Sequence, residues 1–278
     1  MLKTKISDVV LESCMYNASG CLCTSKKDLE NLDKSNAGAM ISKSCTYISR
    51  IGNPHPRYYE NELGSINSTG LANNGYLFYK NLADGFSKPF ILSIATLNWS
   101  DVIYMVNDYS TYPKNCNLVE INVSCPNVEG TKQLAYDTNQ LNKLLTHLGE
   151  YKGIQYGLKL PPFFSPHLLE QVSEVLLNHE HIKFITCCNS LGNCLILNPD
   201  TLKPSIKPRS GLGGVGGDYC KPVCLANVYQ FYKYLKGKID IVGCGGIKTG
   251  QDVVEYIAAG ACAVQIGTHY VKNGAKCF

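Results

Sequence analysis

Short apolar runs alternate with longer amphipathic stretches along almost the whole chain. The runs span four to six residues and most are continuously apolar, which is typical of strands covered on both faces. They predict strands at 15–19, 39–42, 90–94, 118–123, 156–160, 183–187, 239–243 and 263–267.

Helix-like segments separate these strands. Strands that alternate with helices predict parallel pairing through right-handed crossovers, and eight such strands favour a closed barrel over an open sheet. We therefore predict the α/β class and a (β/α)8 TIM barrel that forms one domain over residues 1–278. The helical segments lie near 26–34, 71–84, 99–110, 137–149, 166–178, 222–236 and 249–259.

The eighth strand lacks an equivalent segment, since only residues 268–278 follow it. A covering helix buries several large apolar side chains, each contributing about 1.5–3 kcal/mol. Four or five of them approach the whole stability of a domain, about 5–15 kcal/mol. We therefore expect the eighth covering helix to be missing, which suggests truncation, and the chain to be poorly stable.

Polar, glycine-rich insertions at 43–70, 124–136 and 188–217 all follow the carboxyl ends of predicted strands. That end of a (β/α) barrel carries the active site in this architecture. We therefore expect the chemistry of the protein to lie in these insertions and at the adjoining strand ends.

Composition narrows the class of protein. The 278 residues carry a formal charge of +4, with no run of like charges that would suggest nucleic acid. We see no apolar stretch of bilayer length and no signal peptide, so we expect a cytoplasmic protein without a membrane span. The 14 cysteines are then expected to be reduced. The pairs Cys21/Cys23 and Cys187/Cys188 lack zinc-site spacing, so we predict no metal.

The most informative run is EINVSCPN at 120–127. It places Cys125 just beyond a buried strand, between Asn122 and Asn127, whose amides suit a planar, amide-rich ligand. An isolated cysteine is more often a small buried thiol. In this setting we interpret Cys125 as a general base, which requires a thiol held close to the substrate.

Two lysines lie at the carboxyl ends of predicted strands: Lys43, in SKS, follows the second strand, and Lys159, in GLKL, lies near the end of the fifth. Either one alone is more often a surface charge. Two ammonium groups that enter one pocket repel each other unless an anion or an electron-rich ring lies between them. A reduced flavin meets that need.

Further short motifs supply polar and phosphate-binding groups. Asn189 and Ser190 follow the sixth strand, and the segment 64–71 has the composition to wrap a small ligand. GCGG at 243–246 and GT at 267–268 follow the seventh and eighth strands, the recurrent phosphate position in barrels. Ordinary tight turns are the alternative, but two such loops at these positions favour a phosphate-bearing cofactor.

Taken together, these motifs resemble those of dihydroorotate dehydrogenase, and specifically its soluble, dimeric, fumarate-using class (class 1A). The resemblance extends from about residue 6 to residue 268. It is carried by NASG at 17–20, SKS at 42–44, GNPHPR at 52–57, NSTGL at 67–71, NVSCPN at 122–127, Lys159, NS at 189–190, GCGG at 243–246 and GT at 267–268.

The resemblance implies FMN as cofactor and oxidation of dihydroorotate to orotate, with fumarate reduced to succinate in the same pocket of a homodimer. It implies Cys125 as the base, Lys159 as the stabiliser of the reduced flavin, and Lys43 as a further catalytic residue. The residues implied for the pyrimidine are Lys43, Asn67, Gly70, Leu71, Asn122, Asn127, Asn189 and Ser190. Those implied for FMN are Ala18, Ser19, Gly20, Lys43, Ser44, Asn122, Lys159, Cys188, Gly217, Cys244, Gly245, Gly246, Gly267 and Thr268.

The chain departs from the family pattern at Thr69, where methionine is common, and at Ala72, where proline is common. Both border the substrate loop, so we expect altered affinity with the chemistry retained. Three alternatives stay open. The first is the NAD-coupled class, which also uses a cysteine base. The other two are a related pyrimidine flavoenzyme and an inactive barrel kept as a binding protein.

Overall fold

The computed structural model describes residues 2–112, 114–124 and 133–278. Its centre is an eight-stranded sheet in which every ladder is parallel. The strand order confirms the predicted barrel, and each predicted strand lies within two residues of an observed one. In order around the ring they are β3 (Met15–Asn17), β14 (Ala263–Ile266), β13 (Asp240–Cys244), β10 (Ile182–Cys187), β9 (Gln155–Leu160), β8 (Leu118–Asn122), β7 (Phe90–Ala95) and β4 (Met40–Ile41).

The seam between β3 and β4 is joined by a side chain. The fully buried Asn17 amide donates from Nδ2 to the Ile41 carbonyl (2.9 Å) and accepts at Oδ1 from the Ile41 N–H (2.9 Å). These two bonds satisfy the buried N–H and carbonyl groups of Ile41, which a neighbouring strand would otherwise pair, because buried backbone groups need hydrogen-bond partners. Asn17, the first residue of the NASG motif, thus connects the two outermost strands of the eight.

We predict that Asn17→Ala destabilises the chain. Both Ile41 backbone groups would lose their partner in a buried site, at about 1–3 kcal/mol each, so we expect a total loss of about 2–6 kcal/mol. Urea unfolding measures the change. Asn107→Ala, at an exposed position, is the matched control and should cost less than about 0.5 kcal/mol. Equal stability of the two variants would show that the seam does not depend on Asn17.

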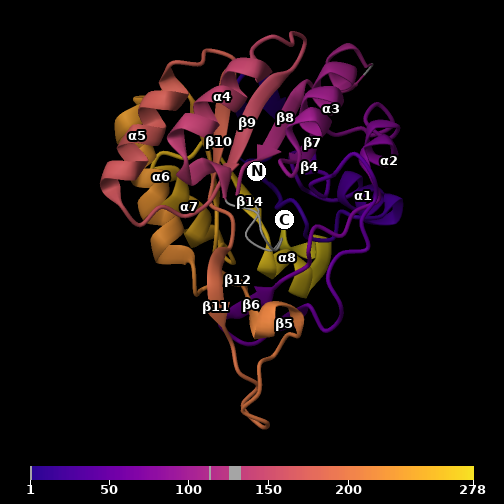
Figure 1. The fold of residues 1–278 in the computed structure, drawn as a ribbon, viewed down its shortest axis with the longest axis vertical. Helices are drawn as coiled ribbons and strands as arrows, with labels where there is room; N and C mark the ends of the chain where they lie inside the picture. The colour runs from indigo at the N-terminus through magenta and orange to yellow at the C-terminus, as the bar shows by residue number, and fades with distance from the viewer. Residues whose placement is uncertain (1, 113, 125–132) are drawn as a thin grey trace.

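Helices surround the barrel strands (Figure 1). Their starts follow from local chemistry: Ser25 and Thr249 form capping boxes with Asp28 and Asp252, and each of these caps satisfies N–H groups that the first turn leaves free. The helices are α1 (Lys26–Asp33), α2 (Tyr76–Lys80), α3 (Trp99–Thr111), α4 (Thr138–Leu148), α5 (Pro166–Leu177), α6 (Lys221–Leu235), α7 (Gly250–Ala258) and α8 (Thr268–Asn273).

Two helices differ from expectation in length. The second predicted segment, 71–84, forms only the short α2, because Leu71 (φ 56°) and Gly75 (φ 86°) have left-handed backbone that a helix cannot contain. After the eighth strand, six residues form α8, followed by a 3-10 turn at Gly274–Cys277. The buried Tyr270 ring of α8 packs on Phe278, with 5.0 Å between ring centres.

A second sheet stands at the carboxyl end of the barrel, and the sequence analysis did not predict it. Its strands come from two of the insertions, 43–70 and 188–217, and pair antiparallel. Figure 1 shows them grouped beside α8. The strands are β5 (Tyr58–Glu60), β6 (Gly64–Asn67), β11 (Leu191–Leu195) and β12 (Leu212–Gly217).

The remaining described elements are small. An antiparallel hairpin, β1 (Thr4–Ile6) and β2 (Val9–Leu11), opens the chain, and single 3-10 turns lie at Leu134–Tyr136 and Pro208–Gly211. Within the described ranges, no helix has both the length and the apolar character of a bilayer span. The thirteen described cysteines are free thiols.

Candidate functional site

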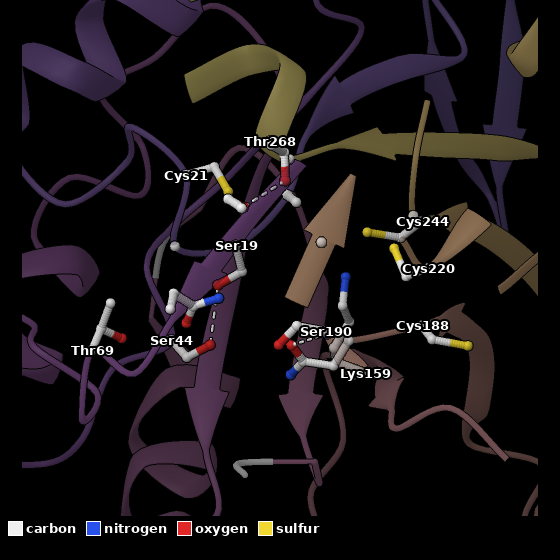
Figure 2. A pocket seen from close by; sticks show the side chains of 18 of the residues that line it. Ser19, Cys21, Ser44, Thr69, Lys159, Cys188, Ser190, Cys220, Cys244 and Thr268 are labelled. Atoms are coloured by element: carbon white, nitrogen blue, oxygen red, sulfur yellow. Dashed lines mark hydrogen bonds between the residues drawn. The ribbon is translucent and has the colours of Figure 1, made fainter. Parts of the chain in front are cut away.

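A pocket of about 1090 Å³, counting its open mouth, lies between the carboxyl ends of the barrel strands and the second sheet. Cofactor sites typically occupy about 300–1,000 Å³. In the view of Figure 2, Ser19 and Ser44 lie on one side and Lys159 and Cys244 on the other. Its lining is Ala18, Ser19, Gly20, Cys21, Lys43, Ser44, Tyr58, Ser65, Asn67, Thr69, Leu71, Asn122, Lys159, Cys188, Asn189, Ser190, Gly216, Gly217, Cys220, Cys244, Gly245, Gly246, Gly267 and Thr268.

The structure brings together nearly all the residues singled out from the sequence. Each of the fourteen assigned to the cofactor lines this pocket, from Ala18 to Thr268. Of those assigned to the substrate, Gly70 does not line it: Gly70 packs on Asn53, where an added Cβ would meet Asn53 Oδ1 at 2.4 Å. Cys125 and Asn127 lie outside the described residues.

Several lining residues were missed, and strand alternation starting from the predicted Asn67 is the signal that would have found two of them, Ser65 and Thr69. Ser65 and Asn67 share one face of β6, and Thr69 continues the same alternation. Tyr58 pairs with Asn67 across the β5–β6 ladder. The missed residues are Cys21, Tyr58, Ser65, Thr69, Gly216 and Cys220.

One wall of the pocket is a chain of hydroxyl groups. The Ser44 hydroxyl lies 3.0 Å from Ser19 Oγ and 3.0 Å from the buried Ser93 Oγ, and it accepts from Asn122 Nδ2 at 3.2 Å. Ser19 Oγ also donates to the Ser42 carbonyl at 2.8 Å. These bonds hold the polar groups of three strand ends in fixed positions.

A second polar group surrounds Asn122 at the end of β8. The backbone N–H and hydroxyl of Ser124 both donate to Asn122 Oδ1, at 3.2 and 3.0 Å. Asn189 Nδ2 donates to Ser124 Oγ at 2.8 Å, and the Ser190 N–H donates to Asn189 Oδ1 at 2.8 Å. Ser124 thus holds Asn122 and Asn189 in place, and these two amides line the pocket together with Ser190, preorganised for a planar polar ligand.

Lys159 is 95% buried, with its ammonium group at the pocket wall. Nζ donates to Gln265 Oε1 at 2.5 Å. Burial lowers the pKa of Lys159, but the neighbouring Cys244 sulfur and the Glu120 carboxylate raise it more, so the net shift is upward. Lys159 is thus a fixed cation at neutral pH.

The described thiols of the pocket are not bases at neutral pH. Burial raises the pKa of Cys21 to about 11, and it also raises the pKa values of Cys188 and Cys244. Each of these groups is therefore a neutral thiol that packs as a small apolar side chain.

Glycines line the end of the pocket where Thr268 lies. Gly246 has φ +69°, and a Cβ there would meet Lys221 Cβ at 2.5 Å; at Gly217 (φ +80°) it would meet the Gly64 Cα at 2.5 Å. Only glycine fits both places. Thr268 Oγ1 lies 3.0 Å from Ser65 Oγ, which joins the barrel to the second sheet. Backbone free of side chains, beside hydroxyl groups, suits a phosphate.

Asp252 of α7 holds the loop that follows Gly246. Its Oδ2 accepts from the backbone N–H groups of Lys248 (2.9 Å) and Thr249 (2.7 Å), and its Oδ1 accepts from Lys221 Nζ. Burial raises the pKa of Asp252, but the bonds from Lys221, Lys248 and Thr249 outweigh it and lower the pKa below its usual 3.8.

We predict a pH-dependent stability from this lowered pKa. The ionised Asp252 stabilises the fold above about pH 4, and that contribution is lost as the pH falls below the unfolded value of 3.8. Asp252→Asn should lower the melting temperature at pH 7, and its difference from wild type should shrink progressively as the pH is lowered below about 4. Glu255→Gln is the control, because Glu255 pairs with Lys221, whereas the backbone N–H groups of the loop donate to Asp252. A constant difference between wild type and Asp252→Asn at every pH would contradict this account.

Comparison with known proteins agrees with this geometry. The profile of the family described as dihydroorotate dehydrogenase matches residues 1–278. A protein of Streptococcus pyogenes serotype M5 named dihydroorotate dehydrogenase A (fumarate) is 41% identical over 285 residues, covering 99% of this chain and 89% of its own. One of the same name from Streptococcus agalactiae serotype Ia is 39% identical over 282 residues, covering 100% and 90%.

Solved structures agree in fold. The dihydroorotate dehydrogenase of Eimeria tenella in complex with ferulenol superposes with a TM-score of 0.80 at 19% identity, covering 99% of this chain and 81% of that one. Its ligand-free form gives a TM-score of 0.79 at 20% identity. The profile match over the whole chain and the relatives at about 40% identity decide the assignment. This chain belongs to the dihydroorotate dehydrogenase family.

Proposed function

We propose that the chain oxidises (S)-dihydroorotate to orotate with FMN as cofactor and fumarate as electron acceptor. The observation that carries the proposal is that two lysines, several side-chain amides and a glycine-rich segment line the same pocket at the carboxyl end of the barrel. The name of the streptococcal relatives supports the choice of fumarate.

The pocket fits FMN at both ends. Gly217, Gly245, Gly246 and Gly267 present bare backbone beside Thr268, which suits a phosphate, and at the first three an added Cβ would clash with neighbouring residues. Lys159 would lie at the electron-rich end of the ring. When bound, FMN accepts the hydride from substrate C6 and later delivers it to fumarate.

Polar side chains would hold the pyrimidine. Asn67, Asn122, Asn189 and Ser190 present amide and hydroxyl groups that match the edges of a planar diamide, and the Lys43 ammonium would pair with its carboxylate. Leu71 would pack against the ring. The family resemblance adds Gly70 and Asn127 to this set.

Cys125 would take the proton from substrate C5. This proposal is supported by its sequence neighbour Ser124, which is fully buried and hydrogen-bonds to Asn122 and Asn189, two of the residues proposed to hold the pyrimidine. When fumarate replaces orotate in the pocket, the same thiol would return the proton as the hydride is delivered, giving succinate. This assignment balances one proton and one hydride in each half-reaction.

Turnover with alternative acceptors tests the proposal. Orotate should form when fumarate is supplied and should not form with NAD as the sole acceptor. Orotate formation with NAD alone would instead indicate the NAD-coupled class. Bound FMN without turnover on either acceptor would favour an inactive barrel that only binds its ligands.

A further inference from the structure

A buried polar network lies inside the barrel beneath the pocket. Glu120 and Asn122 are two residues apart on β8, so their side chains lie on the same face of the strand, towards the inside of the barrel. Glu120 lies one layer deeper, further from the carboxyl end of the strand. Glu120 and Gln265 are fully buried, and Lys159 is 5% exposed. Neither Glu120 nor Gln265 lines the pocket, and neither was predicted from the sequence to have a role.

Gln265 bridges the lysine and the glutamate. Its Oε1 accepts from Lys159 Nζ at 2.5 Å, and its Nε2 donates to Glu120 Oε2 at 2.7 Å. The orientation of the amide follows from its partners, because an ammonium can only donate and a carboxylate can only accept. The amide dipole therefore points from the cation to the anion.

Two neutral groups complete the network. Thr186 Oγ1 donates to the same Glu120 Oε2 at 2.7 Å, and Gln265 Nε2 also lies 3.3 Å from the Tyr16 hydroxyl. Glu120 Oε1 has no hydrogen-bond partner within the described ranges, so the contacts of the carboxylate run through Oε2. A buried charge without compensation is costly, and Glu120 and Lys159 compensate each other through Gln265.

The groups that face Lys159 come from several elements. They are Glu120 on β8, Cys244 on β13, Cys21 after β3 and, across the pocket, Lys43. Burial raises the pKa values of Cys21 and Cys244, so both thiols are neutral at physiological pH, and it raises the pKa of Tyr16 well above its usual value. Lys43 adds a positive charge. Among these groups, Glu120 is the one carboxylate, and the Cys244 sulfur beside Lys159 also favours the charged form of the lysine.

We propose that Glu120 is a positioning residue for Lys159: acting through the Gln265 amide, its carboxylate keeps the Lys159 ammonium protonated and directed into the pocket. Without that negative charge, burial would favour the neutral amine, since fully buried lysines lose their proton about 3–5 pH units below the usual range. The inference deepens the proposed function, because a protonated Lys159 is the group assigned to the reduced flavin.

Acetic anhydride, which acylates only the neutral amine, tests the proposal on the full chain with and without added FMN. Peptide mass spectrometry gives the labelling rate of Lys159 against pH, with the exposed Lys183 of the neighbouring β10 as internal standard. In Glu120→Gln, we expect Lys159 to be labelled at least about 100-fold faster than in wild type at pH 8, since a shift of two pH units is enough for that ratio. Equal rates would overturn the proposal.

Two further variants separate charge from packing. Thr186→Val removes a neutral hydrogen bond to the same carboxylate oxygen and should change the labelling rate of Lys159 less than about threefold. A rise as large as that of Glu120→Gln would mean that packing, not charge, determines the protonation of Lys159.

Gln265→Met keeps both charges but removes the hydrogen bonds that link them, and it replaces Glu120→Gln in the test if that variant does not fold. We expect it to raise the rate about tenfold, and a wild-type rate would contradict the relay.

The labelling rates of the chain without added FMN can be compared whether or not the chain binds this cofactor, so they distinguish this inference from the proposed function. A chain that binds no FMN but labels as predicted would refute the proposed function alone. In FMN-loaded Glu120→Gln, the midpoint potential of the flavin should acquire the pH dependence of one extra proton taken up on reduction. Identical pH dependence in wild type and variant would refute the inference while leaving the proposed function intact.

Discussion

Replacement of Cys125 by alanine is expected to slow reduction of bound FMN by dihydroorotate about 100- to 10,000-fold at neutral pH, the range that a positioned general base supplies. FMN itself should stay bound, because the glycine-rich end of the pocket and Lys159 are unchanged. Anaerobic rapid mixing of the variant with dihydroorotate measures the rate from the loss of flavin absorbance.

A second cysteine serves as the matched control. Cys116 is buried just before the amino end of β8 and does not line the pocket, whereas Cys125 comes after the carboxyl end of this strand in the sequence. Cys116→Ala should reduce its flavin at a rate within a few-fold of wild type. If Cys125→Ala does the same with full FMN occupancy, Cys125 is not the base.

Replacement of Lys159 by methionine should have the second large effect. Methionine keeps the unbranched chain but removes the buried ammonium, and loss of one preorganised donor to a developing charge typically costs about 100- to 1,000-fold in rate. We expect a slower flavin reduction of that size and a lower midpoint potential, since the anionic reduced flavin loses its counter-charge. Potentiometric titration of the FMN-loaded variant measures the second change.

Lys183→Met controls for the loss of a positive charge near this strand. Lys183 is exposed on β10, which pairs with the strand that carries Lys159. Its replacement should leave the potential and the reduction rate unchanged. A wild-type potential in Lys159→Met would show that Lys159 does not act on the reduced flavin.

Local patterns were enough to predict the barrel and most of the pocket. Continuous apolar runs are diagnostic of buried parallel strands, and their carboxyl ends converge, so Lys43, Asn122 and Lys159 could be placed in one pocket from order alone. The glycines at 245 and 246 were recognisable because the loop after the seventh barrel strand is a recurrent phosphate site.

Features that depend on distant partners could not be read in this way. The second sheet pairs residues near 65 with residues near 215, and its short glycine-rich strands carry no apolar alternation. The Asn17 seam and the Gln265 bridge each join residues that only the closed ring brings together. In the sequence, Glu120 is one polar residue in an apolar strand, and its partners Thr186 and Gln265 lie on two other strands.

Anaerobic mixing of the FMN-loaded wild-type chain with dihydroorotate tests the central claim most directly. We expect the flavin absorbance to be lost with one orotate formed per flavin, and to return on addition of fumarate with one succinate formed per flavin. Bound FMN that keeps its absorbance in excess dihydroorotate would contradict the account.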